Sequence, residues 1–274
     1  MKNVEYFPDS AGLAFENVYI TTADNIKING WFIPRKDARY TLLFFHGNAG
    51  NIGHRLEKIK LLYDAGVNPV RELRSLTVNA DGGIEPPSAS LFSPPTSSVA
   101  FSNGVNIFII DYRGYGQSQG KPSEKGLYLD AKSAYDYLVN NRHIQPQDII
   151  LYGESIGGAV AINLASSAKV RALIAEETFT NISDMAKKIY PIIPSFFISA
   201  KFDSLAKIKN IDAPKLFIYS KNDEIVPLEL TRKLYDAAKD PKQFVELSGG
   251  HNSAFLDSRD MYVSAVNVFI KKLK

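Results

Sequence analysis

Residues 149–165 read IILYGESIGGAVAINLA, a short apolar run followed by a glycine–serine motif and a stretch rich in small residues. The motif at 153–157 matches the pattern G-x-S-x-G. A serine between a strand and a helix can present its hydroxyl only on a very sharp turn, and flanking glycines remove the side chains that would clash there. The stretch therefore predicts a strand–turn–helix unit with Ser155 as a nucleophile. A plain strand–helix turn without chemistry is the alternative.

Short apolar runs alternate with helical patterns along the rest of the chain. Continuous apolar strands separated by helices are typical of a parallel sheet covered by helices on both faces. Strands are expected at 40–45, 107–110, 149–152, 172–175, 216–219 and 243–247, and helices at about 54–63, 123–140, 159–165 and 261–273. Each glycine-rich segment follows a strand, so all of them fall at the carboxyl edge of the sheet, where ligands bind.

One segment, residues 69–106, interrupts this alternation. Proline, serine, glycine, threonine and asparagine make up more than half of it, and it contains two Pro-Pro pairs. The triplet Gly-Val-Asn at 66–68 recurs at 104–106, and removal of 69–106 leaves an ordinary short turn into the next strand. We interpret the segment as an in-frame insertion that forms a loop away from the active edge. It resembles the repetitive genetic elements found inside otherwise ordinary bacterial genes.

Composition excludes several classes of protein. The 274 residues are 45% hydrophobic and 22% charged with a net charge of +3, which suits a single globular α/β domain over 1–274 and gives no indication of a nucleic-acid partner. The absence of cysteine excludes disulfides, thiolate nucleophiles and cysteine-ligated metals. No signal peptide or apolar stretch of about 18 residues is present, which predicts a soluble cytoplasmic protein. Peripheral contact with a membrane and a membrane anchor upstream of residue 1 are the alternatives.

A serine hydroxyl is a poor nucleophile unless a base removes its proton. Of the four histidines, His251 follows the last expected strand in a glycine-rich loop, which places it at the carboxyl edge. An ordinary solvated loop histidine is the alternative. We predict that His251 is the general base. The remaining histidines of the chain are His46, His54 and His143.

An acid is needed to orient the imidazole and to stabilise its charged form. Asp223 follows the expected strand 216–219, and the chain order Ser155, Asp223, His251 is the one associated with this sheet architecture. Asp203 and Glu224 are rivals. Asp223 is preferred because Asp203 lies in a helical stretch and Glu224 lies one residue farther along.

The negative oxygen of a tetrahedral intermediate needs N–H donors. We predict that the backbone N–H groups of Asn48, in the loop 46–50, and of Ile156 form this oxyanion hole. A simple glycine turn is the alternative for 46–50. A phosphate-binding loop is excluded because the Lys-Ser/Thr ending of such loops is absent.

Taken together, these motifs resemble the α/β-hydrolase superfamily and, within it, the Bem46-like serine hydrolases. The motifs are HGNAG at 46–50, DYRGYGQS at 111–118, GESIGG at 153–158, ND at 222–223 and GH at 250–251. The resemblance implies an α/β-hydrolase fold, with a mostly parallel sheet of about eight strands, helices on both faces and a small cap. It further implies a Ser155–His251–Asp223 triad, hydrolysis of acyl esters or thioesters, and no cofactor or metal.

The cap is expected within about 176–211. Its apolar, proline-broken stretch 189–198 is either a lid over an acyl pocket or ordinary core packing. The expected partner is a small-molecule or acylated substrate, and the oligomeric state is open. Two other functions remain alternatives on the same fold: a serine aminopeptidase or amidase, and a non-catalytic binding protein.

Overall fold

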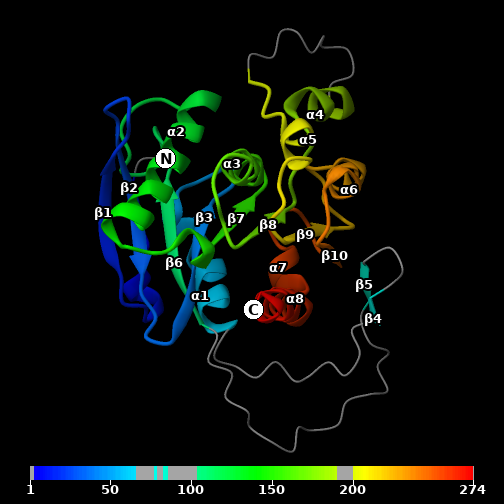
Figure 1. Ribbon diagram of the computed structural model, residues 1–274, viewed down its shortest axis with the longest axis horizontal. Coiled ribbons are helices and arrows are strands. Elements are labelled where there is room, and N and C mark those ends of the chain that lie inside the picture. Colours follow the sequence, from blue (N-terminus) through cyan, green and yellow to red (C-terminus); the bar gives the residue numbers. More distant parts are fainter. Residues whose placement is uncertain (1–2, 66–76, 79–82, 86–103, 190–199, 274) are drawn as a thin grey trace, which may run out of the picture.

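A single mixed sheet forms the centre of the computed structural model, which describes residues 3–65, 77–78, 83–85, 104–189 and 200–273 (Figure 1). The strand order is β1-β2-β6-β3-β7-β8-β9-β10-β5-β4. The strands are β1 (Glu16–Thr21), β2 (Lys27–Ile33), β3 (Ala38–Phe45), β4 (Thr77–Val78), β5 (Gly83–Glu85), β6 (Gly104–Asp111), β7 (Ile149–Glu154), β8 (Ala172–Glu176), β9 (Lys215–Ser220) and β10 (Lys242–Leu247).

The central strands pair in parallel, from β6 through β3, β7, β8 and β9 to β10. At one side β1 and β2 add antiparallel strands. The mostly parallel sheet of eight main strands predicted from the sequence is therefore confirmed. Because the parallel strands point the same way, the loops after β3, β7, β8, β9 and β10 meet at one edge.

Helices cover both faces of the sheet, as predicted. Figure 1 shows α2, α3 and α6 on one side and α1 and α8 on the other, and each group packs on its own hydrophobic cluster. The helices are α1 (Leu56–Ala65), α2 (Glu124–Asp136), α3 (Ile156–Ala165), α4 (Ile182–Ile189), α5 (Ser204–Ile208), α6 (Leu228–Ala237), α7 (Ala254–Asp257) and α8 (Arg259–Lys272).

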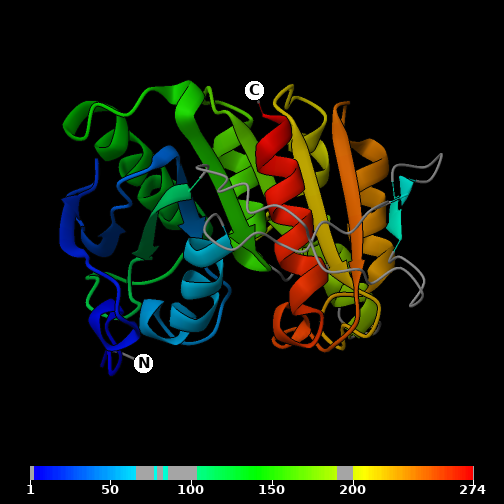
Figure 2. The same cartoon turned by 90° about the horizontal axis from the view of Figure 1, so that it is seen from below.

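The proposed insertion differs from the expected loop in two places. Its short strands β4 and β5 pair with each other, and β5 continues the sheet beside β10 (Figure 2). This covers the N–H and C=O groups that an edge strand leaves unpaired. The last residues of the segment, 104–106, form the start of β6 against β3, and the boundary at 106 stays a prediction. The rest of the segment, 69–76, 79–82 and 86–103, lies outside the described residues.

The expected cap also falls partly outside the described residues. Residue 176 ends β8, α4 and α5 follow, and 190–199, which hold most of the expected lid, are not described. The small cap stays a prediction. None of the helices in the described ranges combines the length and the apolar character needed to cross a lipid bilayer.

Candidate active site

Ser155 lies on the predicted sharp turn, between the end of β7 and the start of α3. Its backbone has φ 55° and ψ −118°, in a region that residues with a side chain rarely adopt. A Cβ on Gly157 would lie 2.0 Å from the carbonyl oxygen of Phe45, and one on Gly153 would lie 2.2 Å from the carbonyl oxygen of Gly157. Both glycines of the motif are therefore required by close backbone approach, and the predicted strand–turn–helix unit is confirmed.

The structure brings His251 and Asp223 together from loops that follow β10 and β9. The Nδ1 atom of His251 is 2.7 Å from Oδ2 of Asp223. The other carboxylate oxygen of Asp223 accepts the backbone N–H groups of Ile225 and Val226, at 2.8 and 2.7 Å. This carboxylate is thus held by its own turn while it binds the imidazole. Since the ring is fixed through Nδ1, its Nε2 atom is left for proton transfer.

The two rival acids have other partners. Glu224 accepts the backbone N–H of His251 at 3.0 Å, so it holds the main chain of the histidine loop. Asp203 caps α5 by accepting the backbone N–H of Ala206 at 3.0 Å. The geometry therefore selects Asp223 as the acid that contacts the imidazole of His251.

The loop 46–50 passes beside the serine, as the predicted oxyanion hole requires. A Cβ on Gly47 would lie 3.6 Å from the Cβ of Ser155. Asn48 is exposed, and its side-chain oxygen accepts the hydroxyl of Tyr115 at 2.7 Å. Ile156 is the first residue of α3, where backbone N–H groups have no partner within the helix. Both predicted donors therefore lie in segments that adjoin Ser155.

Residues 176–178, at the end of β8, connect the serine turn with the histidine loop. The N–H of Ser155 donates to the carbonyl oxygen of Glu176 at 2.9 Å, and the hydroxyl of Thr178 donates to the carbonyl oxygen of Ser155 at 2.8 Å. Between them, Oε2 of Glu177 is 3.6 Å from Nδ1 of His251. Ser155 and His251 thus both contact the segment 176–178.

A buried ion cluster lies under this edge. The ammonium group of Lys58, on α1, is 3.1 Å from Oε2 of Glu154 and 2.9 Å from Oε1 of Glu176. Burial alone would lower the pKa of Lys58, but the two adjacent carboxylates raise it above its ordinary value. Burial alone would raise the pKa of Glu154, but Lys58 and Arg55 lower it. The cluster ties the ends of β7 and β8, which carry the serine turn, to α1.

Glu177 is the residue of this site that sequence reasoning missed. Its side chain is buried, and neither carboxyl oxygen has a hydrogen-bond partner among the described residues. Burial, followed by the negative charge of Glu176, raises the pKa of Glu177 to about 10. The Glu-Glu pair at 176–177, directly after an apolar strand at the carboxyl edge, was the available signal.

The same residues form a group of potential metal ligands. Glu177, Asp223 and His251 each offer one ligand atom, and these atoms lie within 4.8 Å of one another. A cation bound at Nδ1 would replace the 2.7 Å hydrogen bond to Asp223. The arrangement therefore fits an acid–base pair with a second carboxyl group beside it better than it fits a metal centre.

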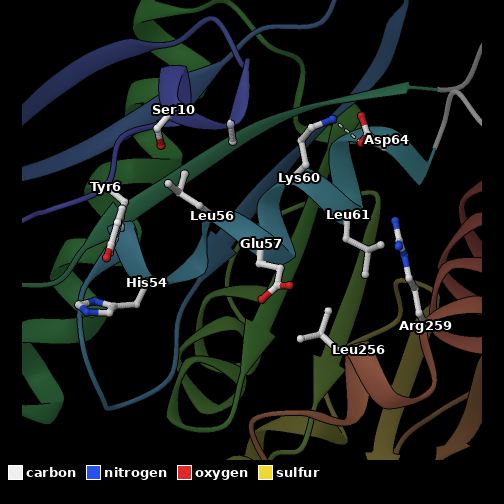
Figure 3. A pocket seen from close by; sticks show the side chains of 12 residues that line it. Tyr6, Ser10, His54, Leu56, Glu57, Lys60, Leu61, Asp64, Leu256 and Arg259 are labelled. Atoms are coloured by element: carbon white, nitrogen blue, oxygen red, sulfur yellow. Dashed lines mark hydrogen bonds and ion pairs between the residues drawn. The ribbon is translucent and has the colours of Figure 1, made fainter.

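A separate groove lies on the face covered by α1 and α8, with a volume of about 510 Å³ (Figure 3). Ser155, Asp223 and His251 are not among the residues that line it. Figure 3 shows Glu57, Lys60 and Asp64 of α1 together with Leu256 and Arg259 around this groove. It is distinct from the site built on the serine turn.

Comparison with known proteins agrees with this architecture. The family model described as serine aminopeptidase, S33, matches residues 98–204. Protein Bem46 of Schizosaccharomyces pombe is 34% identical, over 80% of this chain and 64% of Bem46, so the chain spans less than two thirds of that protein. The α/β-hydrolase domain-containing protein WAV2 of Arabidopsis thaliana is 30% identical, over 99% of this chain and 83% of WAV2.

Two solved structures share the fold. An esterase from Pyrococcus furiosus superposes with a TM-score of 0.73 at 20% identity, covering 99% of this chain and 98% of the esterase. An α/β-hydrolase from Vibrio vulnificus superposes with a TM-score of 0.65 at 21% identity, covering 92% of this chain and 81% of that one. This chain is similar in sequence to Bem46 and, along nearly its whole length, to WAV2, and its sheet has the α/β-hydrolase arrangement. The chain therefore belongs to the Bem46-like family of α/β-hydrolases.

Proposed function

We propose that this protein is a serine hydrolase that cleaves acyl esters or thioesters through a Ser155–His251–Asp223 triad. The observation that carries the proposal is the 2.7 Å hydrogen bond between His251 and Asp223, at the sheet edge where Ser155 occupies its strained turn. A buried acid–imidazole pair at the sheet edge that also carries a serine on such a turn is the arrangement that nucleophilic acyl transfer needs.

In the first half of the reaction, the Oγ of Ser155 attacks the carbonyl carbon of the substrate and passes its proton to Nε2 of His251. The carboxylate of Asp223 stabilises the imidazolium through Nδ1–H. The backbone N–H groups of Asn48 and Ile156 stabilise the oxyanion. The bond from carbon to the alcohol oxygen or thiol sulfur then breaks, and His251 returns the proton to the leaving group. An acyl-enzyme on Ser155 remains.

In the second half, His251 takes a proton from water, and the resulting hydroxyl attacks the acyl carbon. The intermediate collapses by breaking its bond to the Oγ of Ser155, which recovers the proton from His251. The carboxylic acid leaves. Every proton therefore passes through one imidazole, which explains why its orientation by Asp223 matters.

An acyl substrate is favoured by the relatives of this fold. Some proteins that share this fold are esterases, among them the Pyrococcus furiosus protein and an esterase domain from Rhodothermus marinus. We infer the substrate class from these proteins and from the triad chemistry together. The loops that would select an acyl chain differ among proteins of one fold.

The test is hydrolysis of short p-nitrophenyl esters combined with fluorophosphonate labelling. Ser155→Ala should abolish both, while Ser166→Ala, at the other end of the same helix, should leave both within about twofold of wild type. Unchanged turnover in Ser155→Ala would disprove the nucleophile. Failure of the probe to label the wild-type protein would favour a non-catalytic binding protein.

An aminopeptidase or amidase is the second candidate, because the matching family model carries the description serine aminopeptidase, S33. The triad chemistry is the same, with an amine in place of the alcohol or thiol. Rates on aminoacyl p-nitroanilides and acyl p-nitrophenyl esters, measured side by side and corrected with Ser155→Ala, separate the two. A higher kcat/KM on the anilides would replace the ester hydrolase proposal.

A further inference from the structure

Glu177 has three properties that ordinary packing does not require. Its backbone φ is 47°, so it shares with Ser155 the left-handed region that residues with side chains rarely adopt. Its side chain is 1% exposed, and both carboxyl oxygens lack a hydrogen-bond partner among the described residues. One of these oxygens is 3.6 Å from Nδ1 of His251. Strained backbone of this kind concentrates at functional sites.

The surrounding charges explain why this carboxyl group stays protonated. Lys58 pairs with Glu154 and Glu176, and Arg55 lies 3.9 Å from Glu154, so two cations already match two carboxylates. Asp223, His251 and the Tyr262 hydroxyl are further titratable groups near Glu177. An ionised Glu177 would be a fourth carboxylate beside Glu154, Glu176 and Asp223. A neutral acid avoids this cost.

His251 is therefore flanked at Nδ1 by two different carboxyl groups. Asp223, at 2.7 Å, is anchored by two backbone N–H groups and accepts Nδ1–H. Glu177, at 3.6 Å, is neutral and has no anchor. A small movement of either side chain would bring Nδ1–H to Glu177 instead.

We propose that Glu177 is a second positioning acid for His251, held in reserve beside Asp223 to orient Nδ1–H. This inference rests on the proposed function for its catalytic consequence. With Asp223 in place, neutral Glu177 stays beside Nδ1 without a hydrogen bond to it. When the Asp223 carboxylate is lost, one negative charge beside Glu177 is removed and the pKa of Glu177 falls. Once ionised, its carboxylate accepts Nδ1–H and keeps Nε2 free to act as the base.

The proposal predicts an unusual order of severity among Asp223 variants. In Asp223→Asn, the two backbone N–H groups hold the amide oxygen, so the amide nitrogen takes the place beside Nδ1. It donates to the ring and imposes the wrong tautomer, with an expected loss in kcat of about 10⁴-fold. In Asp223→Ala nothing competes with Glu177, and we expect a loss of only about 10²-fold.

The decisive comparison is between Asp223→Ala and Asp223→Ala/Glu177→Gln. The amide cannot ionise, so the double variant should lose about 10⁴-fold, while Asp223→Ala/Glu57→Gln, altered at an exposed glutamate, should match Asp223→Ala. The rate of Asp223→Ala should rise with pH as Glu177 ionises, and the double variant should lack this rise.

A second readout is independent of catalysis. Nitrogen-15 NMR of labelled histidine, assigned with a His251→Gln variant, reports which ring nitrogen carries the proton. Asp223→Ala should keep His251 in the Nδ1–H form, and Asp223→Ala/Glu177→Gln should shift it toward a mixture. Urea unfolding of each variant checks that the fold is retained.

The inference is overturned if Asp223→Ala and Asp223→Ala/Glu177→Gln have the same rates, pH profiles and tautomer spectra. If Ser155 proves not to be the nucleophile, the hydrolase proposal fails, but the NMR comparison still decides whether Glu177 orients His251. Should Asp223→Ala fail to fold, Asp223→Ser and Asp223→Ser/Glu177→Gln are compared in the same way. Equal rates and tautomer spectra for those two would refute the proposal.

Discussion

Lys58 offers the sharpest test of how the serine turn is supported. Its ammonium group lies 3.1 and 2.9 Å from the carboxylates of Glu154 and Glu176, and the three side chains are 4%, 5% and 1% exposed. Lys58→Met keeps a side chain of similar length but leaves two buried carboxylates without this cation. Removal of one partner from a buried ion pair costs about 3–5 kcal/mol, mostly because the remaining charge stays desolvated.

Urea unfolding at pH 8 measures this cost directly. With a slope of about 3 kcal/mol per M, a loss of 3–5 kcal/mol lowers the midpoint by about 1–1.7 M. The matched control is Lys60→Met, two residues along the same helix. Lys60 pairs with Asp64 at the surface, where both side chains are about one third or more exposed, so its loss should cost about 0.5 kcal/mol or less.

The pH dependence of the deficit has a definite sign. Without Lys58, burial raises the native pKa of Glu154 above its unfolded value, so the folded state binds a proton that the unfolded state releases. Stability of Lys58→Met should therefore fall as pH rises from about 5 to 8, and the deficit should shrink toward pH 5. The double variant Lys58→Met/Glu176→Gln should recover part of the lost free energy of unfolding. A variant within 1 kcal/mol of wild type at pH 8, or no worse than Lys60→Met, would refute the role of this cluster.

Three further predictions follow from single contacts. Gly157→Ala should destabilise the fold by about 3 kcal/mol or more in urea unfolding, because its Cβ would meet the Phe45 carbonyl oxygen at 2.0 Å, and near-native stability would contradict this packing. Since the folded pKa of Glu177 is about 10 against an ordinary 4.5, wild-type stability should fall with rising pH between these values, by up to about 1.4 kcal/mol per unit from this group. Glu177→Gln should remove that slope, and identical pH–stability curves would argue against a neutral carboxyl. Glu224→Ala should lower kcat about tenfold with KM nearly unchanged, since the N–H of His251 loses its acceptor, whereas a change confined to KM would place Glu224 in substrate binding.

Much of the parallel sheet could be read from periodicity, but its antiparallel side could not. The buried strands β3, β6, β7, β8 and β9 are continuous apolar runs, and each expected run lies within the strand found. The sequence pattern did not locate β1, because its side chains are mostly exposed and only Val18 is buried. As an edge strand, β1 is ordered by pairing with β2 rather than by its own apolar pattern. Its partner β2 is buried, but Asn29 and Gly30 interrupt its apolar run.

The insertion shows the same limit. Proline pairs predicted a loop, yet β5 forms hydrogen bonds with β10 through only two residue pairs, at Phe244 and Val245. Such short pairing leaves no periodic signal in the sequence. Residues 104–106, which the repeat places at the end of the insertion, pair with β3 at the start of β6.

The order of Ser155, Asp223 and His251 along the chain, each after an apolar run, was sufficient to assign the fold and the candidate triad. The reason is that parallel strands deliver the residues after their carboxyl ends to one edge. Only the tertiary structure separated the acids: Asp223 contacts the imidazole, Glu224 the backbone of His251, and Asp203 a helix end. Burial and distance are properties of the packed molecule, so the neutral, unpartnered carboxyl group of Glu177 beside Nδ1 could be found only there.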